Sequence, residues 1–315
     1  MYEGKRVLVT GGAGFLGSNL VKKLAAEAKH VWVLDDLFTG QRSAVPQRHN
    51  VTFVHGSVTD GTLLRKLLSQ VEYVFHFAAR NITLSVEQPE ADFRTNVEGT
   101  VQLMLQAVAY KDQIERVVYA STSSIYGNSR LLPTVEGGYD IGLPYAASKM
   151  SAELLSIAYG KTFGLPVTCL RFSNVYGPGQ VSSNPYCGVV AKFAEAILQG
   201  EPMVVYGDGT QTRDFTFVDD AIHAVLLTAF QPGTAGEVFN VGTGVETSIN
   251  TLAKLVAAGA GKPTYSIRHA PKRPVDTVDR RCISSEKLQL VTRWSPQVSV
   301  QKGLEKTWQW LQGQV

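Results

Sequence analysis

Short apolar runs alternate with longer amphipathic stretches through the first half of the chain. The apolar runs are rich in β-branched residues and predict buried parallel strands at residues 6–10, 30–34, 51–54, 71–77, 116–120 and 166–172. The stretches between them have helical periodicity, at residues 18–28, 61–70, 89–111 and 144–163, and Asp60 is the expected N-cap of the second helix. Strands that alternate with helices predict an α/β fold with a parallel sheet and right-handed crossovers.

The pattern changes after residue 173. A polar, turn-rich loop is expected over 182–188, then an amphipathic helix over 189–199 and a short strand over 202–206. We therefore expect a sheet domain over 1–173, to which part of the later chain returns, and a smaller mixed α/β lobe over 174–315 that holds a substrate.

Composition excludes several classes of protein. The 315 residues are 44% hydrophobic and 18% charged, as in an ordinary soluble globular protein. The net charge of +3, with no basic stripe, argues against a nucleic-acid partner. The three cysteines lie far apart in sequence, so neither a metal site nor a disulfide framework is expected. With no signal peptide and no run of eighteen apolar residues, we expect a cytoplasmic protein that does not enter a membrane.

Three glycines follow the first predicted strand at once. Gly11, Gly14 and Gly17 form G-x-x-G-x-x-G between a strand and a helix, one residue wider than the better-known G-x-G-x-x-G. Glycines let the backbone approach a pyrophosphate, whose charge the helix N-terminus stabilises. The alternative is a purely structural turn. In this context the motif predicts a dinucleotide site in a Rossmann-type doubly wound sheet.

The second predicted strand ends in Asp35 and Asp36. A carboxylate at this point can accept hydrogen bonds from both hydroxyls of an adenosine ribose and repels a 2′-phosphate. We assign that role to Asp35, since Asp36 has the alternative of capping a turn. The residues favour NAD over NADP, although the nearby Arg42 opposes that argument.

Small and hydroxyl side chains stand at the ends of the later strands. Ala78 leaves room for a flat ligand, and Ser121 to Ser124 bring hydroxyls to the same crevice. His76 reads as a packed histidine, because no partner motif accompanies it. Asn96 has two readings, a cofactor contact or a hydrogen bond between helices.

Tyr145 and Lys149 are four residues apart on a predicted helix, so they lie on one face. An ammonium there favours the phenolate, and a phenol with an ordinary pKa near ~10 then becomes a usable base near neutral pH. By itself this spacing is weak evidence, because charged helix faces carry it by chance.

Taken together, these motifs resemble the extended short-chain dehydrogenases/reductases, in the group of NAD-dependent nucleotide-sugar epimerases and dehydratases. The matching segments run in order along nearly the whole chain: T-G-G-A-G-F-L-G at 10–17, L-D-D-L at 34–37, H-F-A-A at 76–79, N-V-E-G-T at 96–100, S-T-S-S-I-Y-G at 121–127, Y-A-A-S-K at 145–149, R-F-S-N-V-Y-G-P at 171–178, G-D-G-T-Q-T-R-D-F at 207–215, V-F-N-V-G-T-G at 238–244 and R-P-V-D at 273–276.

The resemblance implies bound NAD, a nucleotide-diphosphate sugar substrate and a triad of Thr122, Tyr145 and Lys149. The cofactor contacts that we expect are Gly11, Gly14, Phe15, Leu16, Gly17, Asp35, Asp36, Ser57, Val58, Phe77, Ala78, Ala79, Arg80, Asn96, Ser121, Tyr145, Lys149 and Phe172. The expected substrate contacts are Ser123, Ser124, Asn174, Val189, Val190, Val204, Tyr206, Arg213, Arg273, Asp276 and Arg280, with guanidinium forks suited to the diphosphate. Ser57 departs from the family, where many relatives carry an aspartate beside the adenine.

The residues beside Thr122 favour one reaction of this group. Dehydratases resemble one another in carrying an Asp-Glu pair there, because water elimination needs a separate acid and base. Here those positions are Ser123 and Ser124. We therefore expect a 4-epimerase acting on a UDP-hexose or UDP-uronic acid, with a 4,6-dehydratase or another sugar-nucleotide oxidoreductase as the alternative. A regulator that only senses NAD would be expected to lack Tyr145 or Lys149.

One segment argues for the alternative. Asp279-Arg280-Arg281 resembles the D-R-R of dehydratases, and its first arginine has three readings: a diphosphate contact, a contact to an anionic sugar, or a surface ion pair with Asp279. The helices at 89–111 and 145–163 resemble those that form a dimer interface in relatives. A homodimer is therefore also expected.

Overall fold

The computed structural model describes residues 1–180, 184 and 187–313. The loop expected over 182–188 falls largely outside them. The chain forms two compact units, and the first comprises residues 1–125, 141–171 and 222–239. The second comprises 126–140, 172–221 and 240–315. Residues 126–140, expected in the sheet domain, thus belong to the second unit, and 222–239 is the later segment that returns to the first.

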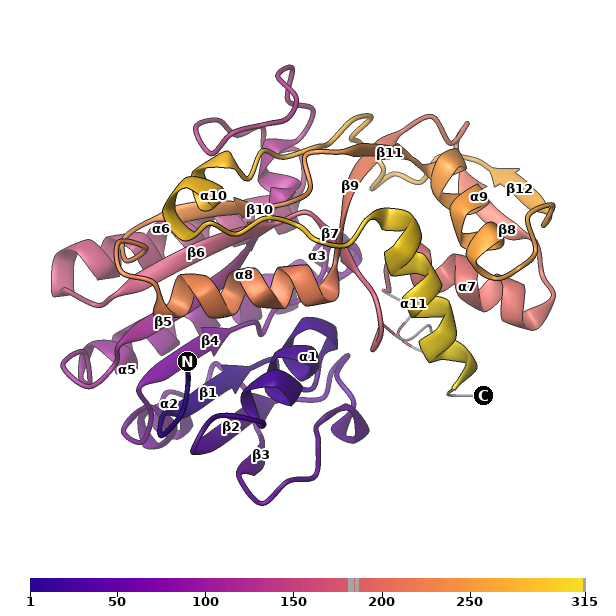
Figure 1. Cartoon of the computed structure of the whole chain (residues 1–315). Helices are drawn as coiled ribbons and strands as arrows, with labels where there is room; N and C mark the ends of the chain where they lie inside the picture. Colours follow the sequence, from indigo (N-terminus) through magenta and orange to yellow (C-terminus); the bar gives the residue numbers. More distant parts are fainter. Residues whose placement is uncertain (181–183, 185–186, 314–315) are drawn as a thin grey trace. The chain divides into compact units, whose positions relative to one another are not determined.

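The first unit is organised on a parallel sheet (Figure 1). Within the described residues it has seven strands in the order β10-β6-β5-β4-β1-β2-β3. Their bounds are β1 (Arg6–Thr10), β2 (His30–Asp35), β3 (Val51–His55), β4 (Tyr73–His76), β5 (Arg116–Thr122), β6 (Val167–Phe172) and β10 (Val238–Val241). The pairs β1–β2, β2–β3, β1–β4 and β4–β5 are parallel. The predicted α/β class and Rossmann-type sheet are confirmed.

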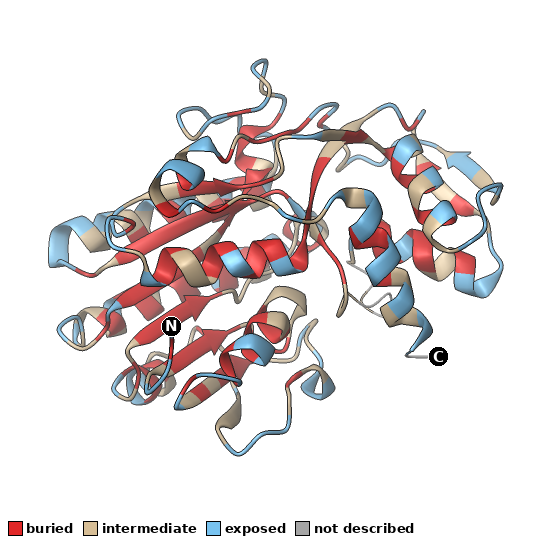
Figure 2. Ribbon diagram, in the orientation of Figure 1, coloured by how far each residue is buried: buried red, intermediate tan, exposed pale blue. Residues whose placement is uncertain are grey.

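Helices cover both faces of this sheet. One face packs against α2 (Gly61–Leu68), α5 (Gly99–Val108) and α6 (Pro144–Phe163), and their apolar side chains form one buried core with those of the strands. Burying each large aliphatic side chain contributes about 1.5–3 kcal/mol. The other face carries α1 (Phe15–Leu24) and most of α8 (Val218–Phe230). The inner strands accordingly appear buried along most of their length, whereas the edge strand β3 is half-buried (Figure 2).

The predicted strands agree with the observed ones to within two residues at each end, but two predictions about helices need correction. α1 begins at Phe15 and ends at Leu24, earlier than expected at both ends. The long helix expected over 89–111 is interrupted. It consists of α4 (Pro89–Phe93), a π-helical turn η2 (Arg94–Glu98) and α5, after a separate α3 (Ile82–Glu87). The predicted N-cap is confirmed, since the Asp60 side chain accepts from the Leu63 amide at 3.0 Å.

The second unit is a mixed α/β structure. It contains a sheet in the order β11-β9-β7 and a two-stranded sheet of β12 and β8. Its strands are β7 (Asn174–Tyr176), β8 (Met203–Tyr206), β9 (Thr212–Phe217), β11 (Glu246–Ser248) and β12 (Ile267–Ala270). Its helices are α7 (Val189–Gln199), α9 (Ile249–Gly259), α10 (Glu286–Thr292) and α11 (Val300–Gln312). In the described part of the chain no helix is long and apolar enough to span a membrane.

Candidate active site

A cavity of about 70 Å³ opens at the carboxyl ends of β1, β2, β3 and β4. Nine of its lining residues are among those expected to contact the cofactor: Gly11, Gly14, Asp35, Asp36, Val58, Phe77, Ala78, Ala79 and Arg80. Five others were not predicted: Leu34, Thr39, Gly40, Gly56 and Thr95. Gly40 and Gly56 could have been predicted as lining residues, because each glycine follows a predicted strand by a few residues.

The glycines of the first turn are required by close approach of backbone to backbone. A Cβ on Gly11 would lie 2.6 Å from the Ala78 nitrogen, and the positive φ of 68° disfavours any other residue as well. A Cβ on Gly17 would lie 2.1 Å from the Gly11 carbonyl oxygen. The two close approaches bring the N-terminus of α1 to the end of β4. Because the first turn of α1 contains no acidic residue, its N–H groups suit an anion.

Asp35 is held in place by the backbone around it. Its two carboxylate oxygens accept from the amides of Ala13 at 2.9 Å and Leu37 at 2.8 Å. Burial raises the pKa of Asp35, and the two amide hydrogen bonds oppose that shift. A carboxylate has further lone pairs, so a ribose hydroxyl can still bind. This arrangement fits the adenosine half of a dinucleotide.

Arg80 closes the pocket on the side of Asp36. Its guanidinium pairs with the Asp36 carboxylate at 2.7 Å and stacks on the Phe38 ring at 4.0 Å. Burial acts to raise the pKa of Asp36, but the hydrogen bond and charge of Arg80 bring it below its usual value. Asp36 therefore has a structural partner, in line with assigning the ribose to Asp35.

Asn96 forms hydrogen bonds to three different segments of the chain. Its Oδ1 accepts from the Arg80 amide at 2.7 Å, and its Nδ2 donates to Asp92 at 2.7 Å and to the Ser148 hydroxyl at 3.1 Å. The residue is buried, lies in the π-helical turn η2 and does not line the cavity, although its neighbour Thr95 does. Of the two readings, the bonding pattern supports contact between segments of the protein.

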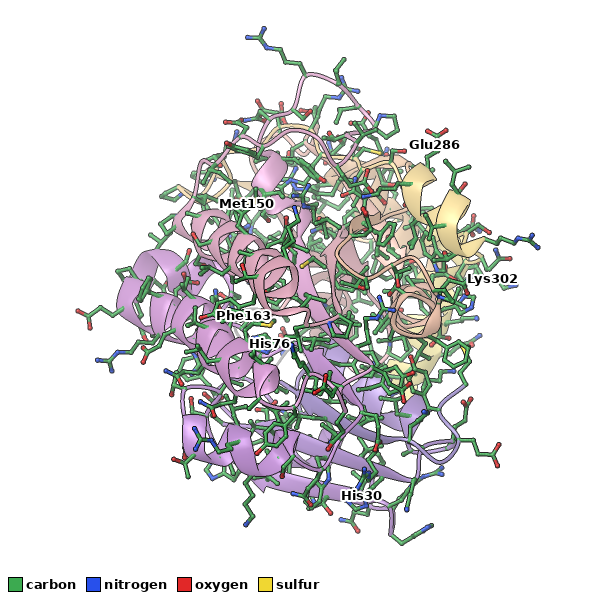
Figure 3. All side chains as sticks on the ribbon, turned by 90° about the vertical axis from the view of Figure 1, so that its left-hand side faces the viewer. His30, His76, Met150, Phe163, Glu286 and Lys302 are labelled. Atoms are coloured by element: carbon green, nitrogen blue, oxygen red, sulfur yellow. The ribbon has the colours of Figure 1, made fainter. Side chains whose placement is uncertain are left out.

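His76 is a packed core residue. Its Nδ1 lies 2.7 Å from the Thr10 hydroxyl and its Nε2 lies 2.9 Å from that of Thr100. Burial and the charge of Lys149 lower the pKa of His76 to about 3, so the ring is neutral at physiological pH. Figure 3 labels it just below Phe163, the last residue of α6 (Pro144–Phe163).

Tyr145 and Lys149 lie one turn apart near the start of α6. Pro144 is the first residue of the helix, so Tyr145 is in the first turn, where the helix dipole favours a phenolate. The Lys149 ammonium lies 4.2 Å from the centre of the Tyr119 ring. Burial lowers the pKa of Lys149 to about 7, and the carboxylates of Asp92 and Glu153 oppose the shift.

The hydroxyl residues Ser121 to Ser124 lie where β5 ends. The chain continues there directly into a short 3₁₀ helix, η3 (Ser123–Tyr126). The Thr122 hydroxyl accepts from the Ser124 amide at 3.1 Å and so caps this turn. Ser123 is buried, whereas Ser124 is half-buried. The Ser121 hydroxyl donates to Glu153 at 2.6 Å.

The remaining expected cofactor residues do not line the cavity. Phe15, Leu16 and Gly17 form the first turn of α1. The Ser57 hydroxyl turns back to Thr59, at 2.8 Å from its Oγ1. Phe172 is buried at the end of β6.

In the second unit, the expected substrate residues fall into two groups. Tyr206, Arg273 and Asp276 come together, since the Arg273 guanidinium lies 4.6 Å from the Tyr206 ring centre and pairs with Asp276 at 2.7 Å. The other group is dispersed. Asn174 is exposed at the start of β7, Val189 begins α7, Val204 is half-buried in β8, and Val190 is packed in the core.

The two other arginines among the expected substrate contacts, Arg213 and Arg280, differ sharply. Arg213 donates to the carbonyls of Thr212 at 2.7 Å and Val278 at 3.0 Å. Burial lowers its pKa, while the charges of Asp276 and Asp279 oppose this. Arg280 is exposed and pairs with Glu246. The surface pair suggested for Arg280 with Asp279 is wrong, because Asp279 binds Lys272 at 3.0 Å.

Comparison with known proteins identifies the class. Residues 7–242 match the NAD dependent epimerase/dehydratase family. The chain is 37% identical over 309 residues to the UDP-glucose 4-epimerase of Mycolicibacterium smegmatis, covering 96% of this chain and 97% of that protein. It is 32% identical over 322 residues to the dTDP-glucose 4,6-dehydratase of Streptomyces niveus, covering 97% and 92%.

A solved structure agrees with these relatives. The UDP-glucose 4-epimerase of Thermus thermophilus in complex with NAD superposes with a TM-score of 0.89 and 36% identity, covering 98% of this chain and 100% of that one. The chain therefore belongs to the NAD dependent epimerase/dehydratase family, which acts on nucleotide sugars, and NAD is its cofactor.

Proposed function

We propose that the chain is a nucleotide-sugar 4-epimerase that inverts C4 of a UDP-hexose or UDP-uronic acid through a transient 4-keto sugar. The observation that carries this proposal is the turn from Ser121 to Tyr126, which presents hydroxyls and contains no carboxylic acid. Elimination of water needs an acid and a base besides the tyrosine. Oxidation and re-reduction at one carbon need only one acid–base group.

Tyr145 is the proposed acid–base group. As a phenolate it takes the proton of the C4 hydroxyl, while the Lys149 ammonium and the N-terminus of α6 stabilise its charge. The Thr122 hydroxyl hydrogen-bonds the same substrate oxygen. When bound, NAD supplies the acceptor for the C4 hydride and later the donor that returns it. Tyr145 then gives the proton back to the inverted hydroxyl, so the cycle is redox-neutral.

Arg213 is the proposed main contact to the diphosphate. Its fork is held by two backbone carbonyls, and among the described residues no carboxylate forms an ion pair with it. A guanidinium held in this way favours a bound anion. Arg273 would change partners from Asp276 to a phosphate, which frees the Asp276 carboxylate for a ribose hydroxyl.

The decisive experiment offers the protein a panel of UDP-, dTDP-, GDP- and CDP-sugars and identifies the products by NMR. A C4-inverted sugar without net NADH release is the expected result. A stable keto product, with or without loss of water, would instead assign the 4,6-dehydratase or dehydrogenase alternative, to which the relative from Streptomyces niveus and the Asp279-Arg280-Arg281 segment point.

Tyr145→Phe tests the role of the phenol. We expect kcat to fall by about 10³-fold, within the range of a lost general acid–base group, while the bound NAD and the melting temperature stay unchanged. Near-full turnover of this variant would remove Tyr145 from the mechanism.

We also propose that the protein is a homodimer. Large apolar side chains are exposed on or next to the helices α4, α5 and α6: Phe93, Leu105, Leu154 and Phe163. Such a patch on neighbouring helices favours association with a second copy. Multi-angle light scattering would give twice the mass of 34.3 kDa, and a monomer would contradict the proposal.

A further inference from the structure

Glu153 is a buried carboxylate on the helix that carries the proposed catalytic pair. It follows Lys149 by one turn and Tyr145 by two, so the three positions share one side of α6. Arg171 on β6 donates from Nε to both of its oxygens, at 3.2 and 3.0 Å, and pairs with it through a second nitrogen. The Ser121 hydroxyl of β5 is the third donor, at 2.6 Å.

Stability alone gives little reason for this pair. Only 2% of the Glu153 side chain and 5% of the Arg171 side chain are exposed, so both charges are removed from water. A buried ion pair recovers its desolvation cost only with good geometry, and apolar replacements of similar volume are often as stable. The bidentate fork does give one thing that apolar packing lacks, a directional link from α6 to β5 and β6.

The Glu153–Arg171 pair joins α6 to the strands that end at the proposed active site, where the position of α6 affects the reaction. β5 ends in Ser121 and Thr122, and Thr122 is the proposed substrate hydroxyl. Tyr145 must lie within hydrogen-bond reach of the same substrate oxygen as Thr122. Displacement of a reacting group by about 1 Å can lower a rate 10²-fold. A sliding helix would change the distance between Tyr145 and Thr122 directly.

The pair also contributes to the charge around Lys149. Asp92 of α4, Glu153 of α6 and Cys169 of β6 act on the charge of this ammonium. The ammonium in turn acts on His76 of β4 and lies over the ring of Tyr119 of β5, while Arg171 of β6 is paired with Glu153 and Tyr145 lies one turn earlier on α6. His76 is neutral, and burial raises the pKa of the Cys169 thiol, so it stays protonated. The charges that remain are those of Asp92, Glu153 and Arg171. Removing one member of the Glu153–Arg171 pair therefore unbalances them.

We propose that Glu153 and Arg171 are positioning residues for the reaction: their fork fixes α6 against β5 and β6, and the Glu153 charge offsets that of Arg171 beside Lys149. The proposal rests on the proposed roles of Tyr145 and Lys149. It adds two residues that touch neither substrate nor cofactor and act through the catalytic helix.

Glu153→Gln and Arg171→Lys separate the two effects. With Glu153→Gln, the charge of Arg171 is no longer balanced, so Lys149 loses its proton more readily and stabilises the Tyr145 phenolate less. In a plot of kcat against pH, we expect the acid limb to move to higher pH by about one unit. At pH values below the limb, kcat should then be about tenfold lower than in the wild type. Arg171→Lys keeps the charge and loses the fork. It should lower kcat about tenfold at every pH, with the limb unmoved.

Glu72→Gln is the matched control. Glu72 accepts from the backbone and side chain of Arg6, at 2.7 and 3.0 Å, at the amino ends of the strands of the same sheet. Its kcat and pH profile should equal those of the wild type. All rates are measured on the holoenzyme and divided by the amount of bound NAD, so a loss of folded protein does not count as a loss of turnover.

The outcomes distinguish the two proposals. Near-full turnover of Tyr145→Phe would overturn the proposed function. An inactive Tyr145→Phe combined with wild-type kcat in Arg171→Lys, or an unmoved limb in Glu153→Gln, would overturn the positioning pair alone. Where Glu153→Gln does not fold, the neutral double variant Glu153→Gln/Arg171→Met replaces it. That variant should keep the wild-type limb and lose kcat about tenfold, and wild-type kcat would overturn the pair.

Discussion

The candidate NAD pocket of the first unit differs in composition from the arginine cluster of the second, which consists of Arg213 and Arg273 with Asp276. Glycines, small side chains and main-chain amides form the pocket, and Asp35 is fixed by two of those amides. The cluster consists of long charged side chains that bind one another or nearby carbonyls, as Arg273 does with Asp276 and Arg213 with Val278. Close backbone packing allows only one arrangement of the pocket, whereas a long charged side chain can pair with any of several partners.

This difference explains which predictions held. Spacing alone located the glycine turn, because any Cβ on Gly17 would meet the Gly11 carbonyl. Spacing could not select between Asp279 and Glu246 as the partner of Arg280, since a long and flexible side chain can pair with a carboxylate that is distant in sequence. The four variants below test the contrast, from the largest expected effect to the smallest.

Gly17→Ala should have the largest effect. The new Cβ would lie 2.1 Å from the Gly11 carbonyl oxygen and force α1 away from the end of β1. We expect a loss of about 3 kcal/mol in the free energy of unfolding and at least a hundredfold weaker NAD binding, measured by urea denaturation and by titration. Gly137→Ala, where no atom lies within 4 Å of the new Cβ, should behave like the wild type. Unchanged NAD binding in Gly17→Ala would contradict a pocket fixed by backbone contact.

Lys149→Met tests a buried cation of the first unit. The folded pKa of about 7 lies below the ordinary value of 10.5, so the unfolded chain binds the extra proton between these values. Wild-type stability from this group is therefore present above pH 10.5 and lost as the pH falls towards 7. The variant should gain stability relative to the wild type as the pH falls, by about 1.4 kcal/mol per unit.

The measurement is urea unfolding of both proteins at pH 7.5 and 9.0, without added nucleotide. The stability difference between variant and wild type should be larger at pH 7.5 by about 2 kcal/mol. A difference independent of pH would show that Lys149 keeps its proton throughout this range.

Arg213→Met tests the cluster of the second unit. The guanidinium held by the Thr212 and Val278 carbonyls is lost, while the aliphatic stem is largely preserved. We expect KM for the nucleotide sugar to rise about tenfold, as for one lost charge-assisted contact, with kcat changed less than threefold. An unchanged KM would mean that the substrate diphosphate binds elsewhere.

Arg280→Gln should have the smallest effect. Its side chain is 63% exposed and already paired with Glu246, and exposed pairs contribute about 0–1 kcal/mol. KM, kcat and the melting temperature should all stay within twofold or two degrees of the wild type. A tenfold rise in KM for a UDP-uronic acid alone, with UDP-hexose unaffected, would instead assign Arg280 to an anionic sugar.

Strong local patterns predicted most of the first unit. Apolar runs bounded by glycines or polar turns defined six of the seven strands, because a strand buried on both faces tolerates little else. The seventh, β10, was missed as a strand. Its residues Val238–Val241 lie next to β6 in the sheet, and β6 comes much earlier in the chain. The π-helical turn at Arg94–Glu98 was also missed, since its residues have ordinary helical periodicity.

By itself, the sequence determined the fold class and the cofactor, and it predicted the glycine turn and the Tyr145–Lys149 pair, because each depends on steric or periodic rules among residues close in the chain. Only the tertiary structure decided the role of residues whose partners are distant. It linked Asn96 to Arg80 and Ser148, His76 to two threonines, and Glu153 to Arg171. A buried polar group must find a partner, and which partner it finds depends on the packing of whole elements.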